Sequence, residues 1–317
     1  MAAYFSALSL AGLVGRLPAC VAQGLIWGIM ALGVYVTFRL LDIADMSVDG
    51  TFSTGGSVVV MLIVGGVNPW LALIVAVICG LAVGCVTGIL HTKLGIPAIL
   101  AGILSQYSLY SINLAIMGFK ANQAVSVDKF YLILSSRYIA PAIGFGLVFV
   151  VVIIAVLYWF FGTETGSALR ATGCNQTMAK AQGININTMK IMGLAISNGL
   201  VALAGALSAQ YSGFADVNAG RGSIVIGLAA VIIGEVIADA VFGKKLNFGV
   251  KLAFIVLGGI IYYVIYTIVL WLKLDPNLMK LFTAIIVAVF LAVPYLKGQA
   301  KNSFMRAGKN SIAGGTK

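Results

Sequence analysis

The chain has 317 residues, of which 61% are hydrophobic and 9% are charged. Soluble domains carry about 25% charged residues, so this composition excludes a water-soluble globular protein. A net charge of +11 would indicate nucleic-acid binding in a soluble chain, but membrane proteins concentrate Lys and Arg in cytoplasmic loops, so we expect a lipid bilayer and no nucleic acid around this protein.

Nine apolar stretches have about the length of 20 residues that a membrane-spanning helix requires. In chain order they are residues 20–40, 47–66, 70–90, 97–118, 138–161, 188–213, 222–242, 249–272 and 277–296. None alternates in the manner of a membrane β-barrel strand. We therefore predict an all-α fold, a polytopic transmembrane helix bundle of about 8–10 spans, some of them broken.

The stretch Leu41–Gly56 is where we expect a break or a re-entrant segment. It contains Asp42, Asp45 and Asp49, three of the nine acidic residues in the chain. Irregular backbone at membrane depth is tolerated only where it lines a cavity or packs inside protein. Asp42 and Asp45 have two interpretations: a solvated loop paired with Arg39, or functional groups inside the protein.

Basic residues predict the orientation of the chain. The tail after residue 294 holds five basic residues and no acidic one, and the turn at 243–251 adds three lysines. Both segments are expected in the cytoplasm, because basic loops stay on that side. Counting spans backward places residues 162–187 and 91–96 in the cytoplasm and residues 119–137 outside.

Two domains follow from this assignment. Residues 1–297 form the transmembrane domain, which includes the cytoplasmic segment 162–187, and residues 298–317 form a basic cytoplasmic tail.

Small residues recur at helical spacing in two of the predicted spans. Gly80, Gly84 and Gly88 lie four residues apart, and the stretch 199–209 (GLVALAGALSA) offers a similar face. Small residues at this spacing allow two helices to approach closely in a membrane. Both faces indicate tight helix packing.

The segment 162–187 is long and polar for a connection between two spans. Residues Gln176–Gln182 are predicted to form a short helix, ended by Gly183 in the position that favours glycine after a helix. Such a helix, lying parallel to the membrane, is either a docking element for a soluble partner or an ordinary amphipathic interface helix. Its exposed residues would be Arg170, Asn175, Met178 and Gln182.

The strings GSALRATGCNQTMAKAQGIN (166–185) and SNGLVALAGAL (197–207) resemble the permease subunits of branched-chain amino acid and simple-sugar (ribose-type) importers. The matching positions are Arg170, Ala171, Gly173, Asn175, Ala179, Gly183, Ile184, Ser197, Ala204 and Gly205. The stretches 45–56 and 220–237 are similar to further family segments, with two departures: an extra Asp49, and Glu235 where the family has a second glycine. The resemblance extends over residues 20–295 and is strongest to a branch suspected of aromatic amino acid import.

The resemblance implies a permease subunit of an ATP-driven importer in the bacterial cell membrane. Its partners would be a second copy of itself, two ATP-binding cassette subunits and an extracytoplasmic substrate-binding lipoprotein. The ATPase-coupling residues would be Arg170, Gly173, Asn175, Met178, Ala179, Gln182 and Gly183. The chain lacks a GxxxxGK[ST] motif, so we expect no cofactor here and ATP-Mg on the partner subunit.

Ionisable and amide side chains inside spans are expensive to bury and mark candidate solute paths. The candidates are Asp45, Asp49, Gln106, Asn113, Asn198, Glu235 and Asp239. For Asp49 and Glu235, a structural hydrogen-bonding role is the favoured interpretation over direct contact with the solute.

An importer permease would carry an amino acid or a related small solute. Two other functions are alternatives to it. A stand-alone secondary transporter or channel would be favoured by inverted repeats with matching broken helices, and we find no convincing pair. A membrane-embedded enzyme requires a catalytic constellation. The chain has one histidine, His91, and four cysteines without metal-ligand spacing, so we predict that it is not an enzyme.

Overall fold

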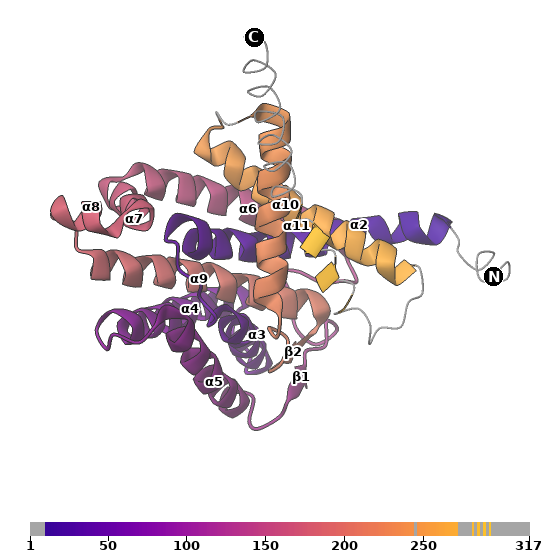
Figure 1. Ribbon diagram of the computed structural model, residues 1–317. Helices are drawn as coiled ribbons and strands as arrows, with labels where there is room; N and C mark the ends of the chain where they lie inside the picture. Colours follow the sequence, from indigo (N-terminus) through magenta and orange to yellow (C-terminus); the bar gives the residue numbers. More distant parts are fainter. Residues whose placement is uncertain are drawn as a thin grey trace, which may run out of the picture.

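A computed structural model describes residues 10–243 and 246–271, together with residues 281, 284–285, 288–289 and 292 (Figure 1). Most of the predicted span 277–296 and all of the tail 298–317 lie outside the described residues.

The described part of the chain consists of helices and one two-stranded sheet. The helices are α2 (Leu10–Tyr35), the π-helical turn η1 (Val36–Leu40), α3 (Val48–Val64), α4 (Pro69–Thr92), α5 (Ala98–Ile116), α6 (Ile139–Gly162), α7 (Glu164–Cys174), α8 (Gln176–Ala181), α9 (Ile186–Ser212), α10 (Ser223–Phe242) and α11 (Phe248–Trp271). The strands β1 (Asn122–Ala124) and β2 (Phe214–Asp216) pair in an antiparallel sense. Among the described residues, seven helices, counting α2 with η1 as one, are long and apolar enough to cross a membrane, and α3 is a shorter apolar helix. The predicted all-α polytopic bundle is confirmed.

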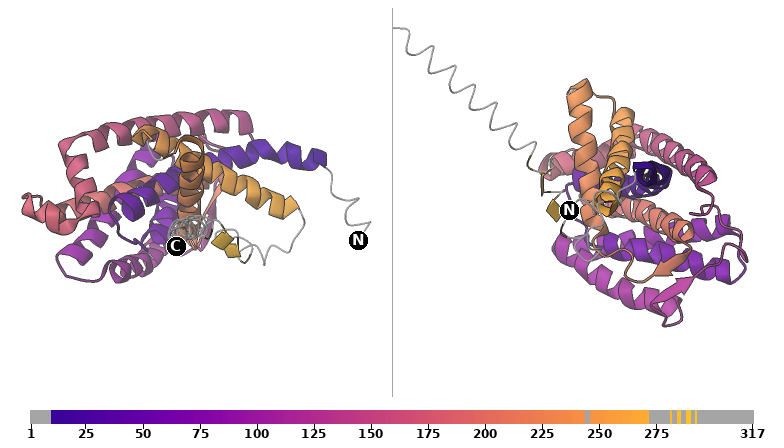
Figure 2. Two further views of the ribbon diagram at one scale, coloured as in Figure 1. Left: turned by 45° about the horizontal axis from the view of Figure 1, so that its top comes forward. Right: turned by 90° about the vertical axis from the view of Figure 1, so that its right-hand side faces the viewer.

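Helices α2 and α9 form the centre of the bundle. Helix α2 packs against α11, α9, α10 and α6, and the right-hand view of Figure 2 shows it end-on among its neighbours. Helix α9 packs against α4, α3 and α2. Side chains of α2 such as Ile29, Met30 and Leu32 are completely buried, so this helix has no face left for lipid along its middle.

The predicted small-residue faces meet each other. A Cβ atom added at Gly84 of α4 would lie 2.3 Å from the carbonyl oxygen of Leu194 in α9. Gly80 and Gly88 are similarly close to the backbone of α9. The small residues at four-residue spacing therefore allow the backbones of α4 and α9 to touch, as is common between membrane helices.

Gly205 of α9 makes a similarly close contact with α3. A Cβ atom at this position would lie 2.0 Å from the carbonyl oxygen of Phe52 in α3. We expect Gly205→Ala to separate α3 from α9 and to cost about 3 kcal/mol, the upper range for overpacking a core. At about 2–4 °C per kcal/mol in large domains, the melting temperature in detergent should fall by roughly 6–12 °C.

Gly144→Ala in α6 is the matched control, because a Cβ atom there would meet nothing within 4 Å. Equal melting temperatures for the two alanine variants would show that α3 and α9 do not pack as described.

The bundle has two ends that differ in structure. Helices α7 and α8 lie at one end, on the left in Figure 1, and the two strands lie toward the other. Gly88, near the end of α4, packs against Ile191 near the start of α9, which places residues 91–96 at the α8 end. The sheet places residues 122–124 at the opposite end. This relative placement agrees with the charge pattern.

The expected break follows η1 and is shorter than predicted. Residues 41–47 are not helical, and α3 then begins at Val48, so the second half of the predicted stretch is regular helix. The interpretation of Asp42 and Asp45 as a solvated loop paired with Arg39 is wrong in both respects for Asp45 and wrong in the pairing for Asp42. Asp45 is only 3% exposed, and Arg39 pairs with Glu235 instead of with either aspartate. Asp42 is exposed and has a positive φ of 56°.

Candidate functional site

A cavity of about 930 Å³ lies between the start of α3, one face of α5 and the segment that leads from β2 to α10. Its lining residues are Asp49, Gly50, Ser53, Ile103, Gln106, Tyr107, Tyr110, Asn113, Val217 and Arg221. Residues 103, 106, 110 and 113 recur at three- and four-residue intervals, so they share one side of α5. Three of the predicted path residues, Asp49, Gln106 and Asn113, are brought together here.

Asp49 lines the cavity and accepts hydrogen bonds from the start of α10. Its Oδ2 accepts a hydrogen bond from the Gly222 N–H (2.8 Å), and its Oδ1 accepts from the Ile224 N–H and the Ser223 hydroxyl (both 2.9 Å). The first N–H groups of a helix lack partners within the helix and attract negative charge. Asp49 therefore links α3 to α10, which agrees with the structural role favoured from the sequence.

Gly220 explains why the chain can approach Asp49 so closely. A Cβ atom at Gly220 would lie 1.9 Å from the Asp49 carbonyl oxygen. The Gly220 N–H also donates to Ser53 Oγ at 3.0 Å. The glycine-rich turn before α10 thus fits against the first two turns of α3.

Arg221 lies beside this link but does not join it. Its guanidinium carbon is 5.8 Å from the centre of the Tyr110 ring, and within the described residues it takes part in none of the three ion pairs. Arg221 was not among the site residues predicted from the sequence. Its signal is an arginine immediately before the start of an apolar helix, where a positive charge is unfavourable for the helix itself.

Asn113 has an incomplete set of hydrogen bonds. Its side chain is fully buried, and its Nδ2 donates to the Gly50 carbonyl at 3.4 Å. Its Oδ1 is buried without a hydrogen-bond partner in the described structure. Buried polar atoms are normally paired, so an acceptor is left over at the wall of the cavity.

Asp45 and Asn198 lie elsewhere, in a hydrogen-bond network between the break and α9. Asn198 Nδ2 donates to Asp45 Oδ2 (2.7 Å), and the Ser47 N–H and hydroxyl both reach Asp45 Oδ1 (2.9 and 2.6 Å). The Thr51 hydroxyl lies 2.6 Å from Asn198 Oδ1. All four side chains are buried. The network fixes the non-helical segment 41–47 to the middle of α9.

The two remaining candidates are at the α8 end. Glu235 accepts from Arg39 Nε (2.8 Å) and pairs with Lys251 Nζ (3.0 Å), so it connects η1, α10 and α11. Asp239, one turn further along α10, is exposed. Neither residue contributes to the cavity lining.

The predicted short helix is present as α8, Gln176–Ala181, one residue shorter than expected. Asn175 Oδ1 accepts from the Met178 N–H at 3.0 Å and so caps the start of the helix. Gly183 has a φ of +80°, as expected for a glycine that ends a helix. Ala179 is buried, whereas Met178 is 65% exposed and Gln182 is also exposed.

Helix α7 connects this exposed helix to the break. A Cβ atom at Gly173 would lie 1.9 Å from the Leu40 carbonyl oxygen. Arg170 donates to the Phe161 carbonyl at 2.9 Å and lies over the Phe248 ring. The α7–α8 segment is therefore packed directly on the last turn before residues 41–47.

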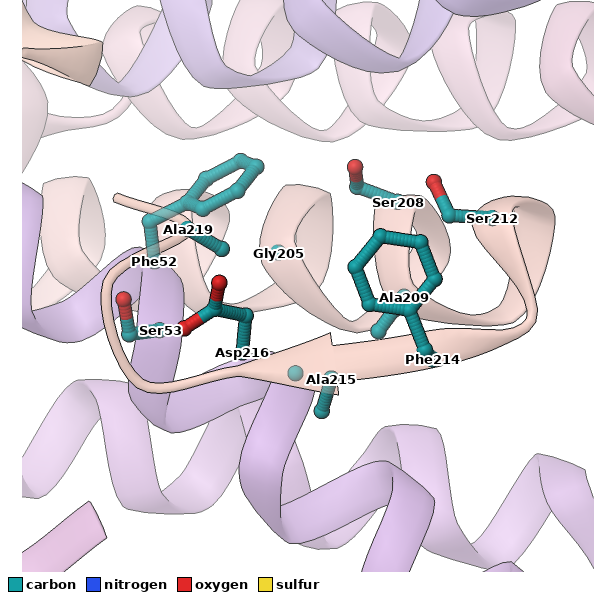
Figure 3. Close-up of a pocket in the computed structure, with 11 residues that line it drawn as sticks. Phe52, Ser53, Gly205, Ser208, Ala209, Ser212, Phe214, Ala215, Asp216 and Ala219 are labelled. Atoms are coloured by element: carbon teal, nitrogen blue, oxygen red, sulfur yellow. The ribbon is translucent and has the colours of Figure 1, made fainter. Parts of the chain in front are cut away.

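A second, smaller cavity of about 80 Å³ lies where α3, α9 and β2 meet (Figure 3). The rings of Phe52 and Phe214, the hydroxyls of Ser208 and Ser212 and the carboxylate of Asp216 line it. A liquid water molecule occupies about 30 Å³, so this space is sized for a few waters. Ser53 lines both cavities.

Residues 17–301 match the family model described as "Branched-chain amino acid transport system / permease component". The chain is 42% identical over 281 residues to a tyrosine transport system permease protein of Clostridioides difficile, covering 89% of this chain and 92% of that protein. It is 27% identical over 216 residues to the ribose import permease protein of Escherichia coli, covering 65% and 64% of the two chains.

One solved structure has a similar fold. It is PsaBC from Streptococcus pneumoniae in complex with Fab, at a TM-score of 0.51 and 14% sequence identity, covering 90% of this chain and 95% of that one. At this identity the likeness concerns the arrangement of the helices alone.

Proposed function

The chain belongs to the family of branched-chain amino acid transport system permease components, and from this membership we propose that it is the transmembrane subunit of an ATP-driven importer for a tyrosine-like amino acid. It is a multi-pass membrane protein and a transport component. The proposal adds the source of energy, the delivery by an external binding protein in a bacterial cell membrane, and the solute. The solute is taken from the name of the relative that is 42% identical.

The observation that carries the proposal is the cavity between α3, α5 and the start of α10. Its volume of about 930 Å³ falls within the range of about 300–1,000 Å³ for small-molecule sites. It combines charged, amide and phenol groups with apolar side chains, and it lies beside the link between α3 and α10. A small polar solute fits this chemistry.

Coupling to ATP hydrolysis is proposed to occur at the α7–α8 segment. Met178 is a large apolar side chain on a short exposed helix, and methionine adapts well to irregular grooves on a partner. Movement of α8 would be transmitted through the contact between Gly173 and Leu40 to the break and to the Asp45 network. ATP-Mg would bind to the partner subunit.

The assembly is proposed to contain two copies of this chain, two ATPase subunits and one binding protein. Each chain has one α7–α8 segment to contact one ATPase subunit, and a pair of identical chains would be related by a twofold axis. The α7–α8 end would then face the cytoplasm and the β1–β2 end would face the binding protein.

The experiment is to purify the chain with its ATPase partner in lipid nanodiscs and to add the binding protein with or without tyrosine. We expect ATP hydrolysis to be faster with the tyrosine-loaded binding protein than with the empty one. A chain that neither copurifies with an ATPase nor changes its rate would favour the alternative, a stand-alone secondary transporter or channel.

A further inference from the structure

We propose that Arg221 binds the carboxylate of the amino acid solute in the cavity, with Asp49 and Asn113 on the side of its ammonium group. This inference rests on the proposed function and adds to it the residues that recognise the solute. It is carried by a difference between the two charged groups of the cavity. The Asp49 carboxylate accepts three hydrogen bonds from the protein, whereas the exposed Arg221 side chain takes part in no ion pair within the described residues.

The negative charge of Asp49 is compensated by protein groups. Two backbone N–H groups and one hydroxyl at the start of α10 donate to its carboxylate. These donors lie at the positive end of a 20-residue helix. The carboxylate therefore needs no cation from the protein, and it uses none within the described residues.

The positive charge of Arg221 is not compensated in the same way. Although Arg221 directly precedes Gly222, whose N–H binds Asp49, its guanidinium is turned over the ring of Tyr110. A guanidinium has five N–H donors in a plane that matches a carboxylate. Within the described residues the guanidinium takes part in no ion pair, so its N–H groups are available to a ligand.

The position of Arg221 does not serve helix stability. A cation next to the first turn of a helix opposes the helix dipole. A residue that lowers stability in a cavity is a candidate for binding, because functional sites commonly break local rules. A bound anion would relieve this repulsion between Arg221 and the helix dipole.

Asp49 and Asn113, which also line the cavity, suit an ammonium group. A carboxylate offers about four acceptor positions, and three donors already occupy Asp49, which leaves about one for a ligand. Asn113 adds the buried Oδ1 that has no partner in the described structure. A zwitterion would match this arrangement, whereas an uncharged sugar would leave Arg221 without a counter-charge.

The aromatic part of the solute would lie against Tyr107. This side chain is 75% exposed although it lines the cavity and belongs to an apolar helix. Offset or edge-to-face contacts between two rings are favourable beyond the burial of apolar area. The site would combine a carboxylate clamp with a ring surface.

The test measures binding to the permease–ATPase complex in nanodiscs, without the binding protein, by the rise in melting temperature that ligand causes. The probe is L-phenylalanine, which shares the ammonium, carboxylate and ring of tyrosine and is more soluble. Phenethylamine, which lacks only the carboxylate, is the comparison ligand. The variants are Arg221→Gln and Arg221→Lys, with Arg137→Gln as the control, because Arg137 is an exposed arginine outside the cavity that pairs with Asp128.

We expect wild type and Arg137→Gln to be stabilised by phenylalanine more than by phenethylamine. Arg221→Gln should bind phenylalanine about tenfold more weakly, which equals about 1.4 kcal/mol, and should no longer distinguish the two ligands. Arg221→Lys, which keeps the charge, should fall between them.

Two results would overturn the inference: equal phenylalanine affinity in wild type and Arg221→Gln, or a wild type that does not respond to phenylalanine at all. Neither result would touch the proposed function, which is tested separately by the response of ATP hydrolysis to the tyrosine-loaded binding protein. If Arg221→Gln lowers the melting temperature of the ligand-free complex, Arg221→Lys serves as the second variant. Its affinity for phenylalanine must exceed that of Arg221→Gln.

Discussion

Replacing Met178 with aspartate is expected to abolish ATP-dependent transport while the chain still inserts into the membrane. Met178 is 65% exposed on α8, and the helix itself is held by the Asn175 cap and by the buried Ala179. The substitution therefore leaves the internal packing of the chain intact. In a complex, it would bury an unpaired carboxylate at the contact with the ATPase, which costs about 3–5 kcal/mol.

A loss of this size corresponds to more than a hundredfold weaker association, since 1.4 kcal/mol equals a factor of ten. The measurement is the amount of ATPase that copurifies with the tagged chain, together with uptake in cells. Met178→Leu is the control, because it keeps a large apolar side chain and should retain both. Normal copurification and uptake by Met178→Asp would show that α8 is not the coupling helix.

The second large effect is expected from Asn198→Ala, which removes the centre of the buried network. The substitution takes the Nδ2 donor from Asp45 and the Oδ1 acceptor from Thr51, and both remaining side chains are almost completely buried. Losing a hydrogen bond to a charged group lowers the free energy of unfolding by about 1.5–3 kcal/mol, and a buried group left unpaired adds its desolvation cost. We expect a destabilisation of about 3–4 kcal/mol, seen as a large fall in melting temperature.

The double variant Asp45→Ala/Asn198→Ala separates this mechanism from simple loss of volume. Removing both partners leaves no unpaired carboxylate, so the double variant should be less destabilised than the sum of the two single variants. Additive losses would mean that Asp45 and Asn198 do not depend on each other, in contradiction to the hydrogen bond between them.

The helices and their packing faces could be predicted from the sequence because both depend on local patterns. Apolar length indicated the spans, and the four-residue spacing of Gly80, Gly84 and Gly88 indicated a close approach that the structure shows against α9. The short helix α8 was predicted from its composition and from Gly183. Each of these features is specified by one short, continuous stretch of the sequence.

The candidate site depends on contacts between distant parts of the chain, which local patterns do not specify. Asp49 meets the start of α10 more than 170 residues later, and Ser47 meets Asn198 about 150 residues later. The sequence marked Asp45, Asp49 and Asn198 as unusual for a membrane span, but not which of them share a site. Arg221 was missed because an arginine in a loop is unremarkable until the structure shows that it lines a cavity and has no ion-pair partner among the described residues.

Uptake of labelled tyrosine into proteoliposomes tests the central claim most directly. The vesicles contain this chain and its ATPase partner, the tyrosine-loaded binding protein is added at the face of the β1–β2 end, and ATP is supplied at the face of the α7–α8 end. We predict accumulation of tyrosine above the outside concentration that requires both ATP and the binding protein. Accumulation without ATP, or no accumulation when all components are present, would contradict the assignment of this chain as the permease of an ATP-driven tyrosine importer.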